Sequence, residues 1–117
     1  MKAIYQVKNN NKQVELYANL TMAKCKAQQY LAERIMAKEP NSRGIWNYNE
    51  SITYIQGIPH FTLTATVGTK RLNGCVRSKT YRQNIKCPKL NDWWTVPNGT
   101  QDFLNLFKRC DNASKDD

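Results

Sequence analysis

The chain has 117 residues, the length of one domain, and 40% of them are hydrophobic, enough to form a core without disulfides or metals. It contains no run of about 18 apolar residues, so we expect no membrane contact, and its N-terminus lacks the apolar segment of a signal peptide. We predict a cytoplasmic protein with one folded domain over 1–111 and a disordered polar tail over 112–117.

The net charge of +9 favours an anionic partner. The abundance of Lys and Asn is typical of AT-rich coding DNA and suggests, as a hypothesis, a low-GC bacterium or its phage as the source.

The first predicted elements are a hairpin and a helix. Ala3–Val7 and Val14–Tyr17 alternate apolar with polar residues around an Asn-rich turn, which favours two paired strands. Leu20–Lys38 has apolar residues at steps of three and four, which predicts an amphipathic helix with Thr21 as its N-cap and an end before Pro40. The polar residues expected on the solvent side of this helix are Lys24, Gln28 and Glu33.

The middle of the chain is predicted to hold a loop followed by two strands. Asn41–Asn49 is expected to be the loop, with Trp46 and Tyr48 covering the edge of the core. Ile52–Gln56 predicts a strand. Phe61–Val67 alternates apolar residues with three Thr, which indicates a strand with one face on the core and its Thr face toward water.

The last part of the chain completes an α+β fold. Asn73-Gly74 is typical of a two-residue hairpin turn and predicts a returning strand over Cys75–Arg82. An irregular connection over Ile85–Gly99 precedes a short helix, Gln101–Arg109, with Thr100 as its N-cap. The predicted architecture is an antiparallel sheet, made of the N-terminal hairpin and three central strands, packed against one long amphipathic helix and a short C-terminal helix.

Positive charge is concentrated in one window of the sequence. Ser51–Asn91 contains seven Lys or Arg residues and no acidic residue, and all seven follow Val67. Positive charge without neutralising partners costs self-repulsion and therefore indicates an anionic partner such as a phosphate backbone. A surface that only serves solubility normally mixes both signs of charge.

The strand register decides which of these cations share a face. A two-residue turn at Asn73-Gly74 would pair Gly68 with Lys79 and would place Lys70, Arg77, Lys79 and Tyr81 on the Thr side of the sheet. A bulge at Gly68 would instead turn Arg71 and Arg82 outward. Cations neutralise phosphates, and a tyrosine ring can stack on a base. The predicted nucleic-acid-binding residues are Lys70, Arg71, Arg77, Lys79, Tyr81, Arg82, Lys86 and Lys89.

The sequence contains no pattern for a catalytic, metal or cofactor site. Cys25, Cys75, Cys87 and Cys110 form no CxxC pair and match no zinc framework, so free thiols are expected. A disulfide, or a Cys/His site that uses His60, is the alternative. The carboxylates are dispersed along the chain, which argues against a two-metal centre. We therefore predict no catalytic residue, no metal and no cofactor.

Three functions are compatible with this sequence. The leading prediction is a small basic nucleic-acid-binding protein, with RNA or single strands favoured because no helix-turn-helix or zinc-finger pattern occurs. The alternative is an inhibitor or adaptor that docks on an acidic or nucleic-acid-handling protein. Val67–Arg71 and Arg77–Tyr81, under a fifth of the chain, resemble the terminal strand region of RelE-like mRNA-interferase toxins, although the intervening turn departs from that spacing. This resemblance implies a metal-independent ribonuclease as a second alternative. No oligomeric state is predicted.

Overall fold

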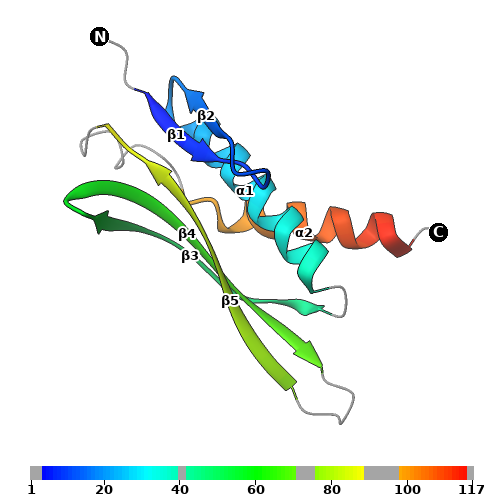
Figure 1. The fold of residues 1–117 in the computed structure, drawn as a ribbon. Coiled ribbons are helices and arrows are strands. Elements are labelled where there is room, and N and C mark those ends of the chain that lie inside the picture. Colours follow the sequence, from blue (N-terminus) through cyan, green and yellow to red (C-terminus); the bar gives the residue numbers. More distant parts are fainter. Residues whose placement is uncertain (1–3, 40–41, 71–75, 89–97, 116–117) are drawn as a thin grey trace.

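The protein has the predicted α+β architecture, with one antiparallel sheet and two helices on one side of it (Figure 1). The computed structural model describes residues 4–39, 42–70, 76–88 and 98–115. The strand order is β2-β1-β5-β4-β3. The elements are β1 (Tyr5–Lys8), β2 (Val14–Tyr17), α1 (Leu20–Lys38), β3 (Ser42–Ile55), β4 (Ile58–Lys70), β5 (Val76–Lys86) and α2 (Thr100–Lys115).

Helix α1 has the predicted bounds, but its N-cap is Asn19 rather than Thr21. Asn19 has an extended backbone just before the first helical residue, and its side-chain Oδ1 accepts a 2.8 Å hydrogen bond from the Met22 amide. That geometry satisfies an N–H at the helix start that has no partner within the helix. The inward stripe of the helix, which includes Ala27, Leu31 and Ile35, is completely buried against the sheet.

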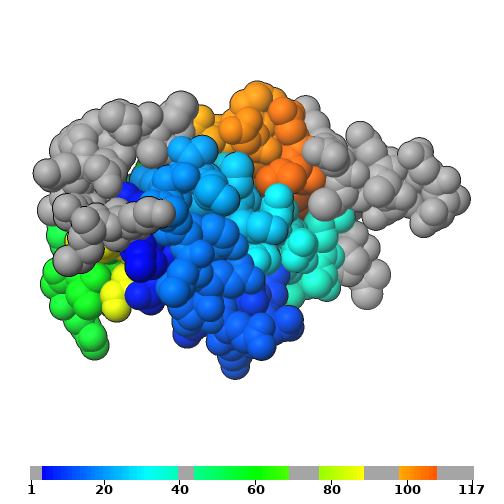
Figure 2. Space-filling view, turned by 90° about the horizontal axis from the view of Figure 1, so that it is seen from above, coloured from blue at the N-terminus to red at the C-terminus, as the bar shows by residue number. Residues whose placement is uncertain are grey.

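The prediction that Lys24 and Gln28 face solvent was wrong, because α2 packs beside α1 and covers this side of it (Figure 2). The Lys24 ammonium forms a 3.2 Å ion pair with Glu50 of β3. Gln28 donates to the Gly99 carbonyl at 2.8 Å and to the Tyr48 hydroxyl at 3.2 Å. These buried polar contacts join α1, β3 and the start of α2.

Strand β3 replaces the loop that was predicted over Asn41–Asn49. Its residues alternate, so that Tyr48 and Glu50 point toward the helices while Asn47 and Asn49 point away. The Tyr48 ring is buried and stacks on Phe103 of α2 with ring centroids 4.5 Å apart. The segment contains few apolar residues, so its sequence carries no hydrophobic alternation that would have predicted a strand.

The register between β4 and β5 differs by one residue from the register that a two-residue turn predicts. Gly68 pairs with Ser78 rather than with Lys79, and Ala65 pairs with Tyr81. The pairing continues through Gly68 without a bulge up to Lys70. The predicted Asn73-Gly74 turn itself lies outside the described residues. Because the side-chain period of a strand is two, a one-residue change exchanges its two faces.

Helix α2 is longer than the predicted Gln101–Arg109. Thr100 is the first helical residue rather than the N-cap, and the Gly99 carbonyl before it accepts a 2.9 Å hydrogen bond from the Phe103 amide. The Asn98 Oδ1 accepts from the Thr100 amide at 2.8 Å and from the Thr100 hydroxyl at 2.6 Å. Phe103 and Phe107 are buried, as their spacing predicts. The predicted tail overlaps the last residues of α2, and its disorder stays a prediction. Most of the predicted irregular connection lies outside the described residues.

Candidate nucleic-acid interface

The side of the sheet that faces away from α1 and α2, here called the outer face, is polar and basic over its centre and carries exposed apolar side chains on β2 and at the β3–β4 turn. Cross-strand partners point to the same side, so the register assigns each residue to a face. On the three long strands the outer face is formed by Asn47, Asn49, Ser51, Thr53, Ile55, Ile58, His60, Thr62, Thr64, Thr66, Gly68, Ser78, Thr80, Arg82, Asn84 and Lys86. Strand β1 adds Gln6 and Lys8, and β2 adds the exposed apolar residues Val14 and Leu16. None of the outer-face residues in the described strands is acidic.

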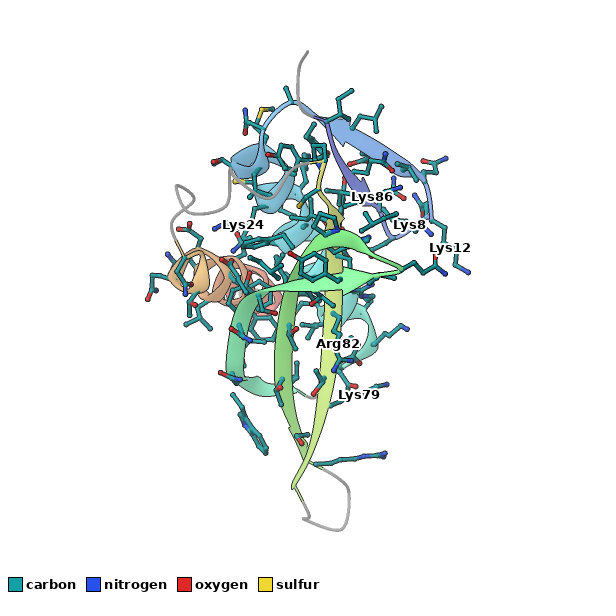
Figure 3. All side chains as sticks on the ribbon, turned by 90° about the vertical axis from the view of Figure 1, so that its left-hand side faces the viewer. Lys8, Lys12, Lys24, Lys79, Arg82 and Lys86 are labelled. Atoms are coloured by element: carbon teal, nitrogen blue, oxygen red, sulfur yellow. The ribbon has the colours of Figure 1, made fainter. Side chains whose placement is uncertain are left out.

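Two of the predicted binding residues lie on this face. Arg82 and Lys86 are exposed, and Arg82 pairs with Thr64 while Lys86 pairs with His60. Figure 3 views the molecule from the side of the long strands, with Lys8 and Lys86 near one end of β5 and Arg82 further along it. The second register considered for the sequence, in which Arg82 points outward, is thus the one found, although no bulge at Gly68 produces it.

The other predicted residues do not join this group. Arg77, Lys79 and Tyr81 lie on the helix-facing side of β5. Lys70 ends β4 and pairs with Val76, and its side chain is outside the described part of the structure. Arg71 and Lys89 fall on residues that are not described. The predicted set is therefore divided between the two faces of the sheet, as far as it is described.

Tyr81 is a core residue and is not placed to stack on a base at the outer face. Its ring is 7% exposed, and its hydroxyl donates a 2.7 Å hydrogen bond to the Glu39 carboxylate. The Lys79 ammonium lies 5.4 Å from the centre of the ring. Burial, together with the hydrogen bond to Glu39, raises the pKa of the Tyr81 hydroxyl to about 12.

Trp46 provides an aromatic surface at the outer face. The pairing shifts between Ile45 and Asn47, which leaves Trp46 as an extra residue in β3. The indole lies directly over Gly68, where a Cβ atom would come within 2.2 Å of the ring. Glycine therefore allows this close approach, and Trp46 remains 55% exposed. The sequence predicted Trp46 in a loop, because the neighbouring residues contain no pattern that indicates a β-bulge.

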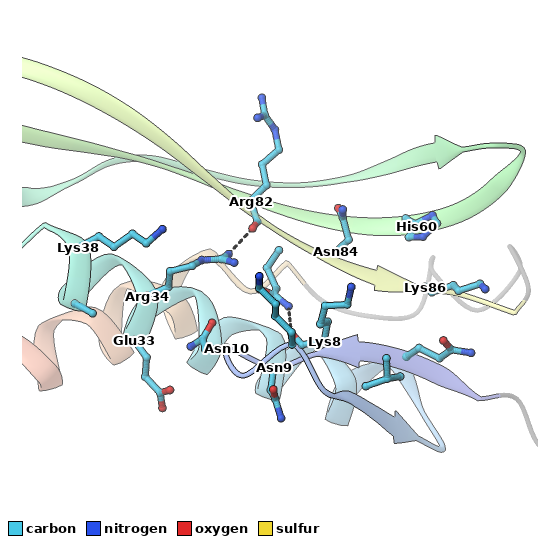
Figure 4. A pocket seen from close by; sticks show the side chains of 15 residues that line it. Lys8, Asn9, Asn10, Glu33, Arg34, Lys38, His60, Arg82, Asn84 and Lys86 are labelled. Carbon is cyan, nitrogen blue, oxygen red and sulfur yellow. Dashed lines mark hydrogen bonds between the residues drawn. The ribbon is translucent and has the colours of Figure 1, made fainter.

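A cleft opens beside the outer face where β1 separates from β5. The two strands pair only at Gln6–Lys86 and Val7–Ile85, and beyond these pairs the Gln83 side chain donates to the Lys8 carbonyl at 2.8 Å. The resulting cleft has a volume of about 1010 Å³ and lies between the β1–β2 turn, the second half of α1 and β5 (Figure 4). We call it the cationic cleft because its lining includes Lys8, Lys12, Arg34, Lys38, Arg82 and Lys86.

The lining of the cationic cleft contains one carboxylate, that of Glu33. Figure 4 shows the Glu33 side chain directed away from β5, whereas Lys8 and Arg34 extend toward it. Lys8, Lys12, Arg34 and Lys38 were not among the predicted site residues. Alternation with the buried Tyr5 and Val7 could have placed Lys8 on the outer side, but Arg34 and Lys38 reach the cleft only through the packing of α1 on β5.

Other chemistry-bearing groups are dispersed. Among the described residues no group of three or more His, Cys, Asp or Glu side chains could hold a metal ion. Cys25 is a free, exposed thiol and Cys87 a free, buried one. His60 contacts the Ile58 carbonyl through Nδ1 at 2.9 Å. The helices in the described ranges are not long and apolar enough to cross a bilayer.

Comparison with protein-family models, with curated proteins and with solved structures found no match for this chain. Arguments about its function therefore begin from the geometry of the outer face and the cationic cleft.

Proposed function

We propose that this chain binds single-stranded nucleic acid, RNA or DNA, on the outer face of its sheet. One observation carries the proposal. Lys8, Arg82 and Lys86 share a connected surface with rows of hydroxyl and amide side chains, and no acidic residue of the described strands points to that side. Cations of this kind neutralise phosphates, and side-chain hydroxyls and amides bond phosphate and sugar oxygens.

The shape of the surface favours a single strand over a duplex. The outer face is formed by extended strands, and no described helix projects from it into a groove (Figure 1). Trp46 leaves part of its indole exposed at this face, and bases of any sequence stack on such a ring. An unpaired strand can present its bases to the sheet while its phosphates follow the cations along β5.

Binding of labelled oligonucleotides by fluorescence anisotropy tests the proposal. A mixed-sequence single-stranded RNA, its DNA counterpart and the corresponding duplexes are compared between about 50 and 200 mM monovalent salt, where phosphate contacts dominate the change in affinity. We expect the single strands to bind more tightly than the duplexes, and their affinity to fall as salt rises. Absence of binding to every oligonucleotide at the lowest salt would refute the proposal.

The two alternative functions stay predictions. An adaptor that docks on an acidic protein would use the same cations, and it would leave oligonucleotides unbound in this assay. The ribonuclease alternative rests on the segments Val67–Arg71 and Arg77–Tyr81, and the Tyr81 hydroxyl of the second segment bonds Glu39 on the helix-facing side. For that reason the present proposal contains no cleavage step.

A further inference from the structure

Arg34 is a partly buried cation that the described protein groups do not neutralise. It extends from α1 into the cationic cleft, where Nη2 donates to the Arg82 carbonyl oxygen (Figure 4). Its Nε atom is buried and has no hydrogen-bond partner. The ion pair found among the described residues joins Lys24 to Glu50, so within this part of the chain no carboxylate pairs with Arg34.

An incompletely bonded guanidinium in such a place is unfavourable for the isolated protein. A buried donor without an acceptor costs roughly 1–3 kcal/mol, and more when the group is charged. Burial also lowers the pKa of Arg34, in the direction expected of a cation without a counter-ion. Proteins pair buried charges with an opposite charge, and an anionic ligand in the cleft would supply one.

The surroundings of Arg34 select the kind of anion. The side chains of Lys8 and Lys38 line the same cleft, whereas the Arg82 side chain is directed to the other side of β5 (Figure 4). The one lining carboxylate, that of Glu33, is directed away from β5. A guanidinium forms two parallel hydrogen bonds with a carboxylate or a phosphate. Several cations around one arginine suit the higher charge and the additional oxygens of a phosphate.

We propose that the cationic cleft is a phosphate-binding site with Arg34 as its main donor and Lys8 and Lys38 as supporting cations. The inference deepens the proposed function and rests on it for the source of the phosphate. That source is a phosphodiester of a bound strand, because the cleft opens beside Arg82 and Lys86 of the outer face. A free phosphate compound such as a mononucleotide offers the same chemistry, and the experiment distinguishes the two.

The test follows the Arg34 Nε–H signal in proton–nitrogen NMR spectra, because a buried Nε–H exchanges slowly with water. The signal is assigned by its absence in Arg34→Lys. The probes are sodium pyrophosphate, a nucleoside monophosphate and a single-stranded oligonucleotide, each added at constant ionic strength. We expect a saturable shift with all three, and a loss of pyrophosphate affinity of roughly tenfold or more in Arg34→Gln.

Two further variants keep the test decisive if Arg34→Gln does not fold. Lys8→Ala and Lys38→Ala retain Arg34 and should each weaken pyrophosphate binding several-fold, whereas Lys26→Ala, at an exposed position of α1 that does not line the cleft, should not. If pyrophosphate and the mononucleotide shift the Arg34 Nε–H signal to saturation but no oligonucleotide binds, the phosphate site is supported and the proposed nucleic-acid binding is refuted. If an oligonucleotide binds and the Arg34 Nε–H signal does not move, the phosphate site is refuted. It is also refuted if the probes move this signal no more than sodium chloride does.

Discussion

Replacing Glu50 by Gln tests how the protein holds its two helices against the sheet. The Glu50 side chain is 4% exposed and accepts hydrogen bonds from Lys24 Nζ at 3.2 Å, the Tyr48 hydroxyl at 2.6 Å and the Gly99 amide at 3.1 Å. Glutamine keeps the shape and one carbonyl acceptor but removes the charge. The Lys24 ammonium, on a side chain 7% exposed, then loses its counter-charge.

The expected loss of stability is large for a domain of this size. Removing one partner of a buried ion pair costs about 3–5 kcal/mol, and the retained carbonyl acceptor places Glu50→Gln near the lower value. A domain of this length has a total stability of about 5–15 kcal/mol. Each kcal/mol lowers the Tm of such a domain by about 4 °C, so we expect a fall of about 12 °C.

Urea unfolding followed by tryptophan fluorescence measures this effect. Glu33→Gln is the matched control, because Glu33 is exposed on the same helix as Lys24 and its loss should change the stability by less than about 0.5 kcal/mol. The double variant Lys24→Met, Glu50→Gln should recover part of the loss, since it leaves no buried charge unpaired. A loss below about 1 kcal/mol in Glu50→Gln would refute the reasoning.

Three further predictions concern single side chains. Trp46→Ala should weaken single-strand binding by about 1–3 kcal/mol without changing its salt slope, because indole stacking carries no charge; a changed slope in the anisotropy assay would contradict this. The Tyr81 pKa of about 12 lies above its unfolded value of about 10, so the stability that this hydroxyl contributes is complete below about pH 10 and is lost between about pH 10 and 12. As the pH rises over that range, the urea midpoint of the wild type should therefore approach that of Tyr81→Phe. A difference in midpoint that stays constant with pH would contradict a stabilising role for the Tyr81 hydroxyl. Cys25 should react with a thiol reagent before Cys87, whose burial raises its pKa to about 11, and equal rates in peptide mass spectra would argue against that burial.

Elements with their own local signals could be predicted from the sequence. The apolar stripe of Leu20–Lys38 and the proline after it defined α1, and the alternation around Phe61–Val67 defined the core of β4. The end of β3 was predicted as the strand Ile52–Gln56, but its first part lacks such a signal, because the inward residues there include the polar Glu50 and the half-polar Tyr48. The burial of Lys24 depends on α2, which follows about seventy residues later, so no local pattern could reveal it.

The candidate site was predicted only in part, because its members depend on register and packing. The concentration of charge predicted a site on β5, which stays a prediction, but the β4–β5 register differs by one residue from the predicted one and places Tyr81 in the core and Arg82 on the outer face. Asn73-Gly74 favours a two-residue turn when only local conformation is considered. The buried positions of Ala65 and Tyr81 suit the register that is found, because it brings both onto the core side.

The salt dependence of single-strand binding in two double variants tests the central claim most directly. Arg82→Ala with Lys86→Ala removes two cations from the outer face, and Lys26→Ala with Lys79→Ala removes the same charge from exposed positions on the helical side. Each lost phosphate contact lowers the log–log salt slope by about 0.7, so the outer-face variant should lose about 1.4 in slope and about 25-fold in affinity at about 0.1 M salt. The helical-side variant should keep the wild-type slope. Equal losses in both variants, or a larger loss in the helical-side variant, would contradict the claim that the outer face binds the strand.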